Sequence, residues 1–262
     1  MKKARILMIG DIFAKTGKFA VRKVLPGLIA NKELDFVIAN GENIAGGVGI
    51  TPDLANHLFD LGVNVITSGN HIWRQREIRS YIQDNDTLLR PFNYLQSQPG
   101  SGYGLYETPA GIKIGVINLA GQVYMDVHPD NPFMAADKAL VQLKNADIII
   151  VDFHAEATSE KRALGYYLDG RVQAVLGTHT HVQTSDNQIL SGGTAFITDV
   201  GMTGPHNSVI GMRKDVVMGR FVTGLPESFK PAKGGARFQG VIIDIQDRQA
   251  VNIERLDISV PE

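Results

Sequence analysis

The chain has no cysteine, and this absence limits the chemistry that it can carry. Among its 262 residues there is no thiol, so disulfides, thiolate metal ligands and a cysteine nucleophile are all excluded. Any metal site must therefore be built from histidine, carboxylate and amide groups. The lack of cysteine also fits a reducing compartment.

Long apolar runs and an excess of charge of one sign are missing too. No stretch approaches the roughly 20 apolar residues of a transmembrane helix. Near the start, Arg5 interrupts a short apolar run and Asp11 ends it before it reaches the length of a signal peptide. We therefore expect a cytoplasmic protein without a membrane partner. Lysine and arginine number 26 against 27 aspartates and glutamates, a balance that offers no general attraction for a long polyanion.

The composition and the hydrophobic pattern predict an α/β fold. A content of 44% hydrophobic and 20% charged residues is typical of an ordinary globular protein. The length suits one large domain or two small ones, and because no repeat or linker interrupts the chain we predict a single domain over residues 1–262. Two mixed sheets flanked by helices are the simplest assembly.

Short β-rich runs alternate with amphipathic stretches along the chain. A hairpin turning at Ala110 and Gly111, a hairpin over 188–201 and a closing strand pair are also expected, with Gly/Pro-rich loops at 201–208 and 226–240. The expected strands are 4–10, 35–40, 64–69, 147–153, 171–177, 240–245 and 250–258. The expected helices are 18–30, one opening at Thr51 and Pro52, 74–83, one from Asn131 to near Asn145, and 158–168.

Metal-capable polar residues follow five of the predicted strands. In open α/β sheets, ligands bind at the carboxyl ends of strands. Each residue also has an ordinary structural explanation, such as a turn aspartate, a turn asparagine or a core histidine. Five strand ends that all carry such groups are harder to explain by structure alone. These residues are Asp11; Glu42 and Asn43; Asn70 and His71; His154; and His179 and His181.

The last pair, His179 and His181, sets a geometric condition. Alternate residues of an extended segment point to opposite sides, so the two imidazoles can approach one site only if the backbone bends between them. A strand that runs into a turn provides such a bend.

The chemical interpretation is a binuclear centre. A carboxylate can bridge two divalent ions about 3.5 to 4 Å apart, and histidine nitrogens and amide oxygens can fill the other positions. Such ligands suit Zn, Mn, Fe or Co and do not choose among them. A hydroxide between the two ions would attack phosphorus, and His71, next to Asn70, would protonate the leaving group as general acid.

These motifs resemble those of the calcineurin-like metallophosphoesterases. The resemblance rests on Gly-Asn-His at 69–71, a lone histidine at 154 and Gly-Thr-His-Thr-His at 177–181, in the order of that superfamily. Two departures stand out. The usual Asp-x-His is here Asp11-Ile12-Phe13, and the usual Gly-Asp is here Gly41-Glu42-Asn43.

Both departures match the YmdB-like bacterial subfamily, which the chain resembles along nearly its whole length. Further matching phrases lie at 39–47, 152–161 and 198–205. The resemblance implies a four-layer αββα sandwich, with Glu42 bridging two divalent ions (Fe, Mn or Zn). It assigns Asp11, Asn43 and His181 to one ion and Asn70, His154 and His179 to the other. The implied activity is hydrolysis of phosphodiesters, with cyclic nucleotides such as 2′,3′-cyclic AMP among the substrates. On this ligand set we expect a dimetal phosphodiesterase that acts on small nucleotides or short RNA ends.

Other functions and residues stay open at this point. The same metal core could serve a phosphomonoesterase, or a regulatory protein that binds a nucleotide or a protein partner with only incidental hydrolysis. A homo-oligomer is compatible with the sequence. His57 and His128 have no assigned role, and the possible substrate contacts are His206, Tyr124, Phe229 and Arg237.

Overall fold

A computed structural model describes residues 2–261 and contains two mixed β-sheets. The first sheet has the order β2-β11-β12-β1-β3-β4, with β13 paired to β12, and the second has the order β5-β6-β7-β8-β10-β9. The strands of the first sheet are β1 (Lys3–Ile9), β2 (Asp11–Ile12), β3 (Phe36–Asn40), β4 (Val65–Thr67), β11 (Met202–Pro205), β12 (Ala236–Gln246) and β13 (Gln249–Ser259). Those of the second are β5 (Tyr103–Glu107), β6 (Lys113–Ala120), β7 (Ile148–His154), β8 (Ala174–Thr178), β9 (Gln188–Ile189) and β10 (Ala195–Ile197).

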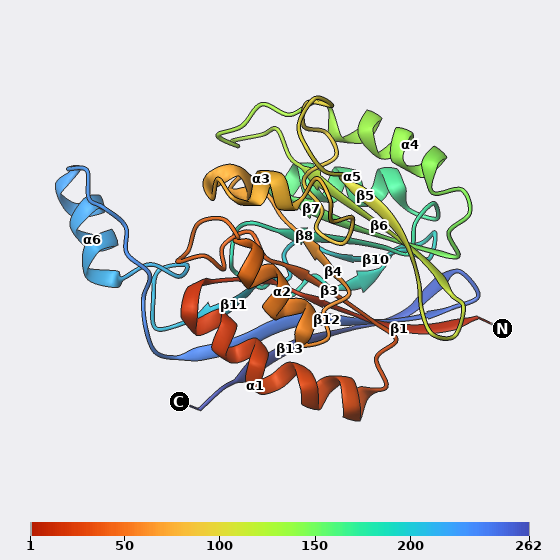
Figure 1. The fold of residues 1–262 in the computed structure, drawn as a ribbon, viewed down its shortest axis with the longest axis horizontal. Coiled ribbons are helices and arrows are strands. Elements are labelled where there is room, and N and C mark those ends of the chain that lie inside the picture. The colour runs from red at the N-terminus through yellow and green to blue at the C-terminus, as the bar shows by residue number, and fades with distance from the viewer. Residues whose placement is uncertain (1, 262) are drawn as a thin grey trace.

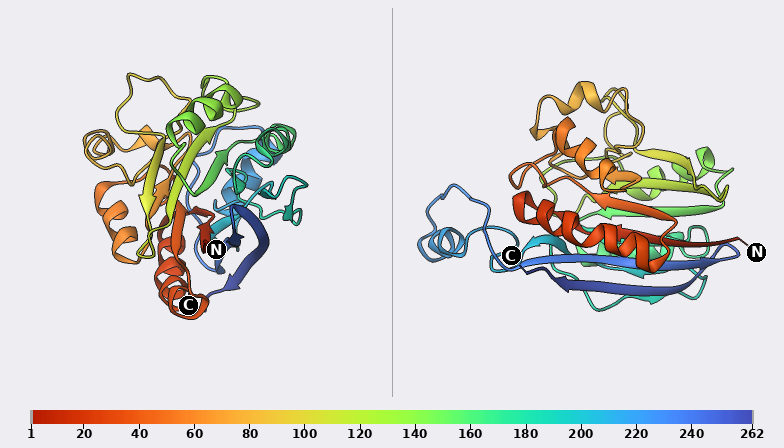
Figure 2. Two further views of the ribbon diagram at one scale, coloured as in Figure 1. Left: turned by 90° about the vertical axis from the view of Figure 1, so that its right-hand side faces the viewer. Right: turned by 60° about the horizontal axis from the view of Figure 1, so that its bottom comes forward.

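The two sheets pack face to face, and helices cover their outer faces (Figures 1 and 2). Strand β1 shows how: Ile6 and Met8 join the core between the sheets, whereas Leu7 and Ile9 join the core beneath α1 (Ala14–Lys32) and α2 (Pro52–Asp60). A third core lies between the second sheet and the helices α4 (Pro132–Gln142) and α5 (Thr158–Leu168). The predicted four-layer αββα sandwich is therefore confirmed.

The directions of the strands determine where the site lies in the fold. Strands β1, β3 and β4 run parallel in the first sheet, and β6, β7 and β8 run parallel in the second. The carboxyl ends of each parallel set share one edge of their sheet, so the loops that leave them can meet across the sandwich.

Helices that have a capping residue in the sequence begin where they are predicted to begin. Thr51 caps α2 and accepts a hydrogen bond from Leu54 N, and Asn131 caps α4 with bonds from Phe133 N and Met134 N. The helix predicted at 158–168 is α5. Helix α1 is longer than predicted and already begins at Ala14, whose N–H donates to the carbonyl of Asn43.

Three local predictions are wrong. In place of a helix over 74–83 there is a 3₁₀ helix η1 (Ile72–Arg74) and a short α3 (Ile78–Tyr81), because Gln75 is extended and its side chain donates to the carbonyl of Val48. The loop predicted at 201–208 contains β11, and the one at 226–240 ends in β12.

Helix α6 (Lys214–Thr223) escaped prediction, although its apolar residues Val217, Met218, Phe221 and Val222 lie at helical spacing. Of these only Val217 is buried. It projects from the body on the side opposite the N-terminal end of β1 (Figure 1). Among residues 2–261, no helix is both long and apolar enough to cross a membrane.

Candidate metal centre

The structure brings every residue predicted for the metal site to the meeting point of the two sheets. Strands β1 to β4 and the residues that follow them deliver five of the side chains from the first sheet, and β7 and β8 deliver three from the second. Four of them, Asp11, Glu42, Asn43 and His154, are almost fully buried. The other four are partly exposed, and the His71 side chain at the rim is 27% exposed. The set consists of Asp11, Glu42, Asn43, Asn70, His71, His154, His179 and His181.

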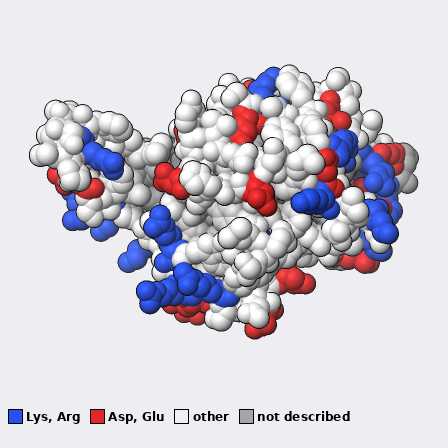
Figure 3. Space-filling model, turned by 90° about the horizontal axis from the view of Figure 1, so that it is seen from above, with Lys and Arg blue, Asp and Glu red and all other residues white. Residues whose placement is uncertain are grey.

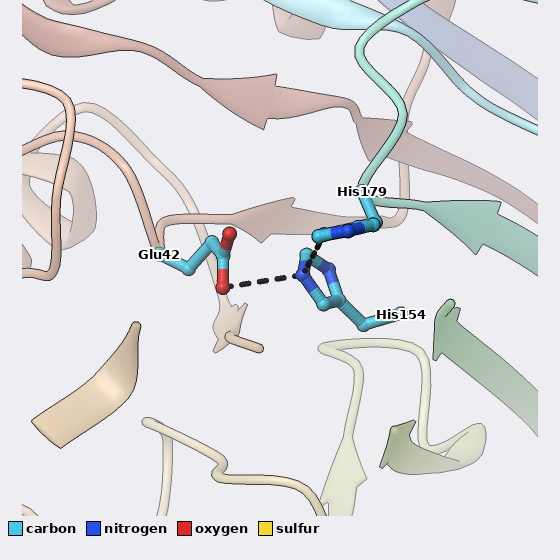
Figure 4. A group of neighbouring side chains, drawn as sticks. All are labelled: Glu42, His154 and His179. Carbon is cyan, nitrogen blue, oxygen red and sulfur yellow. Dashed lines mark hydrogen bonds and ion pairs between the residues drawn. The ribbon is translucent and has the colours of Figure 1, made fainter. Parts of the chain in front are cut away.

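His154 lies at the centre of the first group of donor atoms. Its Nε2 is 3.2 Å from Glu42 Oε2, 3.1 Å from Asn70 Oδ1 and 3.0 Å from His179 Nδ1. Figure 4 shows Glu42 and His179 converging on this imidazole from the two sheets. Four potential ligands, two oxygens and two nitrogens, thus face one small volume, which is the arrangement that a divalent ion requires.

Asp11, Asn43 and His181 form the second group. His181 Nε2 lies 3.7 Å from Asp11 Oδ1 and 3.1 Å from Asn43 Nδ2, and the same amide nitrogen donates to Glu42 Oε1 at 2.9 Å. Glu42 therefore has one carboxylate oxygen in each group. The oxygen of Asn43 faces His71, so ligation through this oxygen requires a half-turn of the amide.

A relay of hydrogen bonds fixes the tautomer of His154. Asp152 accepts hydrogen bonds from Asn40, Thr67 and Thr178, the last at 2.7 Å from Thr178 Oγ1 to Asp152 Oδ1. Because the hydroxyl hydrogen of Thr178 is used there, its oxygen accepts from His154 Nδ1 at 2.9 Å. The Nε2 of His154 is left without a hydrogen and with its lone pair toward the donor cluster.

The other two histidines are oriented in the same way. His179 Nε2 lies 3.3 Å from Glu156 Oε2, and His181 Nδ1 donates to the carbonyl of Ile210 at 2.9 Å. In each ring the nitrogen that points away from the cluster has an acceptor, so the other nitrogen is free to bind an ion. Metal-bound histidines usually have such a partner.

The turn after β8 provides the predicted bend. Both His179 (φ 102°) and His181 (φ 64°) have left-handed backbone angles, which cost about 1 to 3 kcal/mol each outside glycine. Thr180 is held between them, because its N–H and hydroxyl both donate to Asp199 Oδ2, at 3.0 and 2.7 Å. Asp199 in turn is paired with buried Lys161 at 2.8 Å. This ion pair anchors the strained turn.

Several residues that build the site escaped the sequence analysis. Thr178, Asp152 and Glu156 orient ligands, and Lys161 and Asp199 anchor the turn. The first three have a local signal, since Asp152 and Glu156 lie two residues on either side of His154 and Thr178 directly precedes His179. No local signal in the sequence indicates the pairing of Lys161 with Asp199, because the two residues are far apart in the chain.

The charges of the cluster fit bound cations. Burial raises the pKa of Asp11, whose Oδ1 is buried and has no hydrogen-bond partner among the described residues. Burial alone would raise the pKa of Glu42, but His154 and His71 hold it well below its ordinary value. Two buried carboxylates with an unpaired oxygen are costly unless positive charge compensates them.

The histidines respond to the same charges. Burial alone would lower the pKa of His154, but the carboxylates of Glu42 and Asp11 raise it to about 9. Burial and the neighbouring charge of His154 lower the pKa of His179 to about 3. The raised pKa of His154 shows that the buried carboxylates favour positive charge at this point of the cluster.

His71 occupies the rim of the centre, beside Asn43. Its Nδ1 donates to Asn43 Oδ1 at 2.8 Å, and its backbone N–H donates to Glu42 Oε2 at 3.2 Å. With Nδ1 engaged, Nε2 is the nitrogen available to a substrate. This placement suits the predicted general acid.

The remaining candidates have partners of their own. His206 donates to the carbonyl of Met202 and lines a cavity together with His181. Arg237 is paired with Asp257 on β13, Phe229 lies against the guanidinium of Arg220, and the Tyr124 side chain is 86% exposed. His57 is half-buried on α2. Their substrate roles stay predictions.

Comparisons with known proteins agree over almost the whole chain. A family model described as YmdB-like protein matches residues 7–256. The 2′,3′-cyclic-nucleotide 2′-phosphodiesterase of Bacillus subtilis strain 168 is 46% identical over 258 residues, which cover 97% of each chain.

Two crystal structures share the fold. One, described as a hypothetical protein from Thermus thermophilus, is 41% identical with a TM-score of 0.93, and the match covers 98% of this chain and 100% of that one. The other, described as a novel phosphatase from Mycoplasma pneumoniae, is 34% identical with a TM-score of 0.93, and the match covers 99% of this chain and 94% of that one. Because the family model and these relatives span nearly all of the chain, the protein belongs to the YmdB-like family.

Proposed function

We propose that this protein is a dimetal-dependent phosphodiesterase that hydrolyses small phosphodiesters, among them 2′,3′-cyclic nucleotides such as 2′,3′-cyclic AMP. The observation that carries the proposal is the buried cluster in which Glu42 offers one oxygen to each of two donor groups. The activity of the Bacillus subtilis relative supports the substrate class. We place the activity in the cytoplasm, where the lack of cysteine fits a reducing environment.

The surface supports a small substrate. Acidic and basic side chains are mixed over most of the face in Figure 3, and the basic ones that gather at its lower left do not form a stripe across it. Proteins that bind long nucleic acids present such stripes. Short RNA ends remain within the proposal, because they need only local contacts.

The ligand roles follow from the two donor groups. Asp11, Asn43 and His181 would hold one divalent ion, and Asn70, His154 and His179 the other, with Glu42 shared. Bound there, two such ions would polarise the phosphoryl oxygens and make a water acidic enough to attack at neutral pH. The donor set is compatible with Fe, Mn or Zn.

The residues of the chain have three tasks in this reaction. Thr178, Glu156 and the carbonyl of Ile210 fix the ring nitrogens of the histidines, so no tautomer has to change when a substrate arrives. Burial of Glu42 and Asp11 keeps water from competing for their oxygens. After the half-turn that ligation requires, the amide nitrogen of Asn43 faces His71 Nδ1 and donates to it. The ring hydrogen of His71 then lies on Nε2, from which it would be donated to the leaving oxygen.

Replacement of the shared carboxylate tests the proposal. Glu42→Gln keeps the shape of the side chain but removes its charge. We expect the variant to lose bound metal and to fall by more than about 100-fold in kcat/KM on 2′,3′-cyclic AMP, because even changes to the partners of metal ligands cost about 10- to 100-fold. Glu107→Gln, at an exposed position on β5, is the control. Full turnover and full metal content in Glu42→Gln would refute the mechanism.

His71 has a separate signature. A general acid matters for a poor leaving group and not for nitrophenolate, which departs without a proton. His71→Ala should therefore lower the rate of hydrolysis of 2′,3′-cyclic AMP by about 10²- to 10⁴-fold. The rate on a nitrophenyl phosphodiester should fall far less. Equal slowing of both substrates would assign His71 a positioning role instead. His57→Ala, on α2, is the matched control.

A phosphomonoesterase is the second candidate, favoured by the description of the Mycoplasma pneumoniae structure as a phosphatase. Both reactions use the same kind of metal core, so the loops decide between them. Rates on adenosine 3′-phosphate and on 2′,3′-cyclic AMP, measured on one preparation, separate the two. We expect the diester to be the faster substrate, and a faster monoester would reverse the assignment.

A further inference from the structure

A cavity of about 190 Å³ opens beside Asn70. Trp73 of η1 forms one wall, and the segments 93–98 and 127–130 form the others. Pockets that enclose a whole drug-sized ligand occupy about 300 to 1,000 Å³. This cavity is smaller and adjoins the metal centre, so it has room for one ring system attached to a phosphate bound there.

The walls of the cavity are largely apolar and include an indole. Trp73 is the single tryptophan of the chain, and its Nε1 donates to Gln98 Oε1 at 3.1 Å, which holds the ring in place. Leu95, Val127 and Pro129 complete the apolar lining. A fixed aromatic ring in such a wall is the usual platform for stacking a nucleobase.

The charges around the cavity exclude the phosphate from it. No lysine or arginine lines the cavity, and its ionisable lining groups include His128 and the carboxylate of Asp130 at the exposed rim. Phosphate sites in proteins are normally built from arginine, lysine or clustered N–H groups. The cavity therefore suits the uncharged part of a substrate.

Tyr94 adds an unused hydrogen-bonding group to this cavity. The residue is 6% exposed, and its hydroxyl is buried behind the wall and has no hydrogen-bond partner among residues 2–261, so a ligand reaches it only by displacing part of that wall. Burial, with the charge of Glu42, raises the pKa of this phenol, so it keeps its hydrogen at neutral pH. Buried polar groups are nearly always paired, and an unpaired one calls for a partner that is not part of the chain.

We propose that this cavity is the nucleoside subsite of the enzyme, with Trp73 stacking on the base and Tyr94 donating its hydroxyl hydrogen to the nucleoside. This inference rests on the proposed function, because it places the phosphate of the same substrate at the metal centre. It makes the enzyme selective for cyclic phosphates that carry a base.

A pair of substrates that differ only in the base tests the subsite. The two are 2′,3′-cyclic AMP and 1-O-methylribose 2′,3′-cyclic phosphate, and the quantity compared is the ratio of their kcat/KM values. We expect Trp73→Leu to lower this ratio by about tenfold or more, the scale of a lost base–aromatic stack, and Tyr94→Phe to lower it about threefold to tenfold. Tyr166→Phe, at an exposed position on α5, should keep the ratio of the wild type.

Fluorescence gives a readout that does not depend on catalysis. At an excitation wavelength that tyrosine does not absorb, emission of the wild-type protein comes from Trp73, the single tryptophan. Adenosine 3′-phosphate should quench this emission and inorganic phosphate should not. If the protein hydrolyses diesters but the substrate ratio stays at its wild-type value in both variants, the subsite is wrong and the proposed function stands. If no diester is hydrolysed, the proposed function fails, and the fluorescence experiment alone then tests the subsite. Absence of quenching by saturating nucleotide would overturn it.

Discussion

The glycine at position 69 offers a sharp test of the metal centre. A Cβ added to Gly69 would lie 2.2 Å from His154 Nε2 and 2.3 Å from Glu42 Oε2. Real Cβ contacts essentially never fall below 3.0 Å, so in Gly69→Ala these atoms must separate by about 0.8 Å. Both belong to fully buried side chains, and both are proposed ligand atoms.

The size of the effect follows from this displacement. A misplacement of about 1 Å in a catalytic site can cost about 100-fold in rate, and strain of this kind in a packed interior costs about 1 to 3 kcal/mol of stability. The backbone angle of Gly69 is not left-handed, so steric contact alone causes the defect. We expect Gly69→Ala to bind less metal and to lose about 100-fold in kcat/KM on 2′,3′-cyclic AMP.

Metal content per chain and steady-state rates measure this outcome, with circular dichroism to verify the fold. The control is Gly27→Ala in α1, where an added Cβ meets nothing within 4 Å and the helix gains up to about 1 kcal/mol. If Gly69→Ala kept the metal content and the rate of the wild type, the close approach of His154 and Glu42 at this glycine would be wrong.

The groups that hold the ligands yield further predictions. Glu156→Gln should weaken metal binding by about 10- to 100-fold, because a carboxamide orients His179 less firmly; titration with Mn measures this, and unchanged affinity would contradict it. Lys161→Met should cost about 3 to 5 kcal/mol in the free energy of unfolding, since Asp199 then stays buried without its partner. Burial alone would raise the pKa of Asp199, but Lys161 and the hydroxyl of Thr180 hold it below 3.8. The stability contributed by Asp199 is therefore complete above that pH and is lost as the pH falls through the lower folded value. Urea unfolding followed from about pH 5 down to about pH 2 should show this loss in the wild type and not in Asp199→Asn.

Much of the architecture could be predicted because its signals are local. Short apolar β-rich runs identify the strands, and caps such as Thr51 and Asn131 mark helix starts. Helix α6 escaped prediction, and in the structure only its Val217 is buried. The helix expected at 74–83 is interrupted by the hydrogen bond from Gln75 to the carbonyl of Val48. That residues 1–262 form one domain stays a prediction.

The site residues could be proposed from strand ends and from family resemblance. Neither source reveals the partners that orient them. The bond of His181 to the carbonyl of Ile210 and the ion pair of Lys161 with Asp199 depend on chain segments that meet only in three dimensions. The unpaired hydroxyl of Tyr94 is likewise a property of packing.

Metal analysis of protein purified without oxygen tests the central claim most directly. Two divalent ions per chain in the wild type, and a clear loss in Glu42→Gln together with the loss of 2′,3′-cyclic AMP hydrolysis, are the predicted result. Wild-type protein that is stripped of metal, kept in chelator and still hydrolyses this substrate at the full rate would contradict the account.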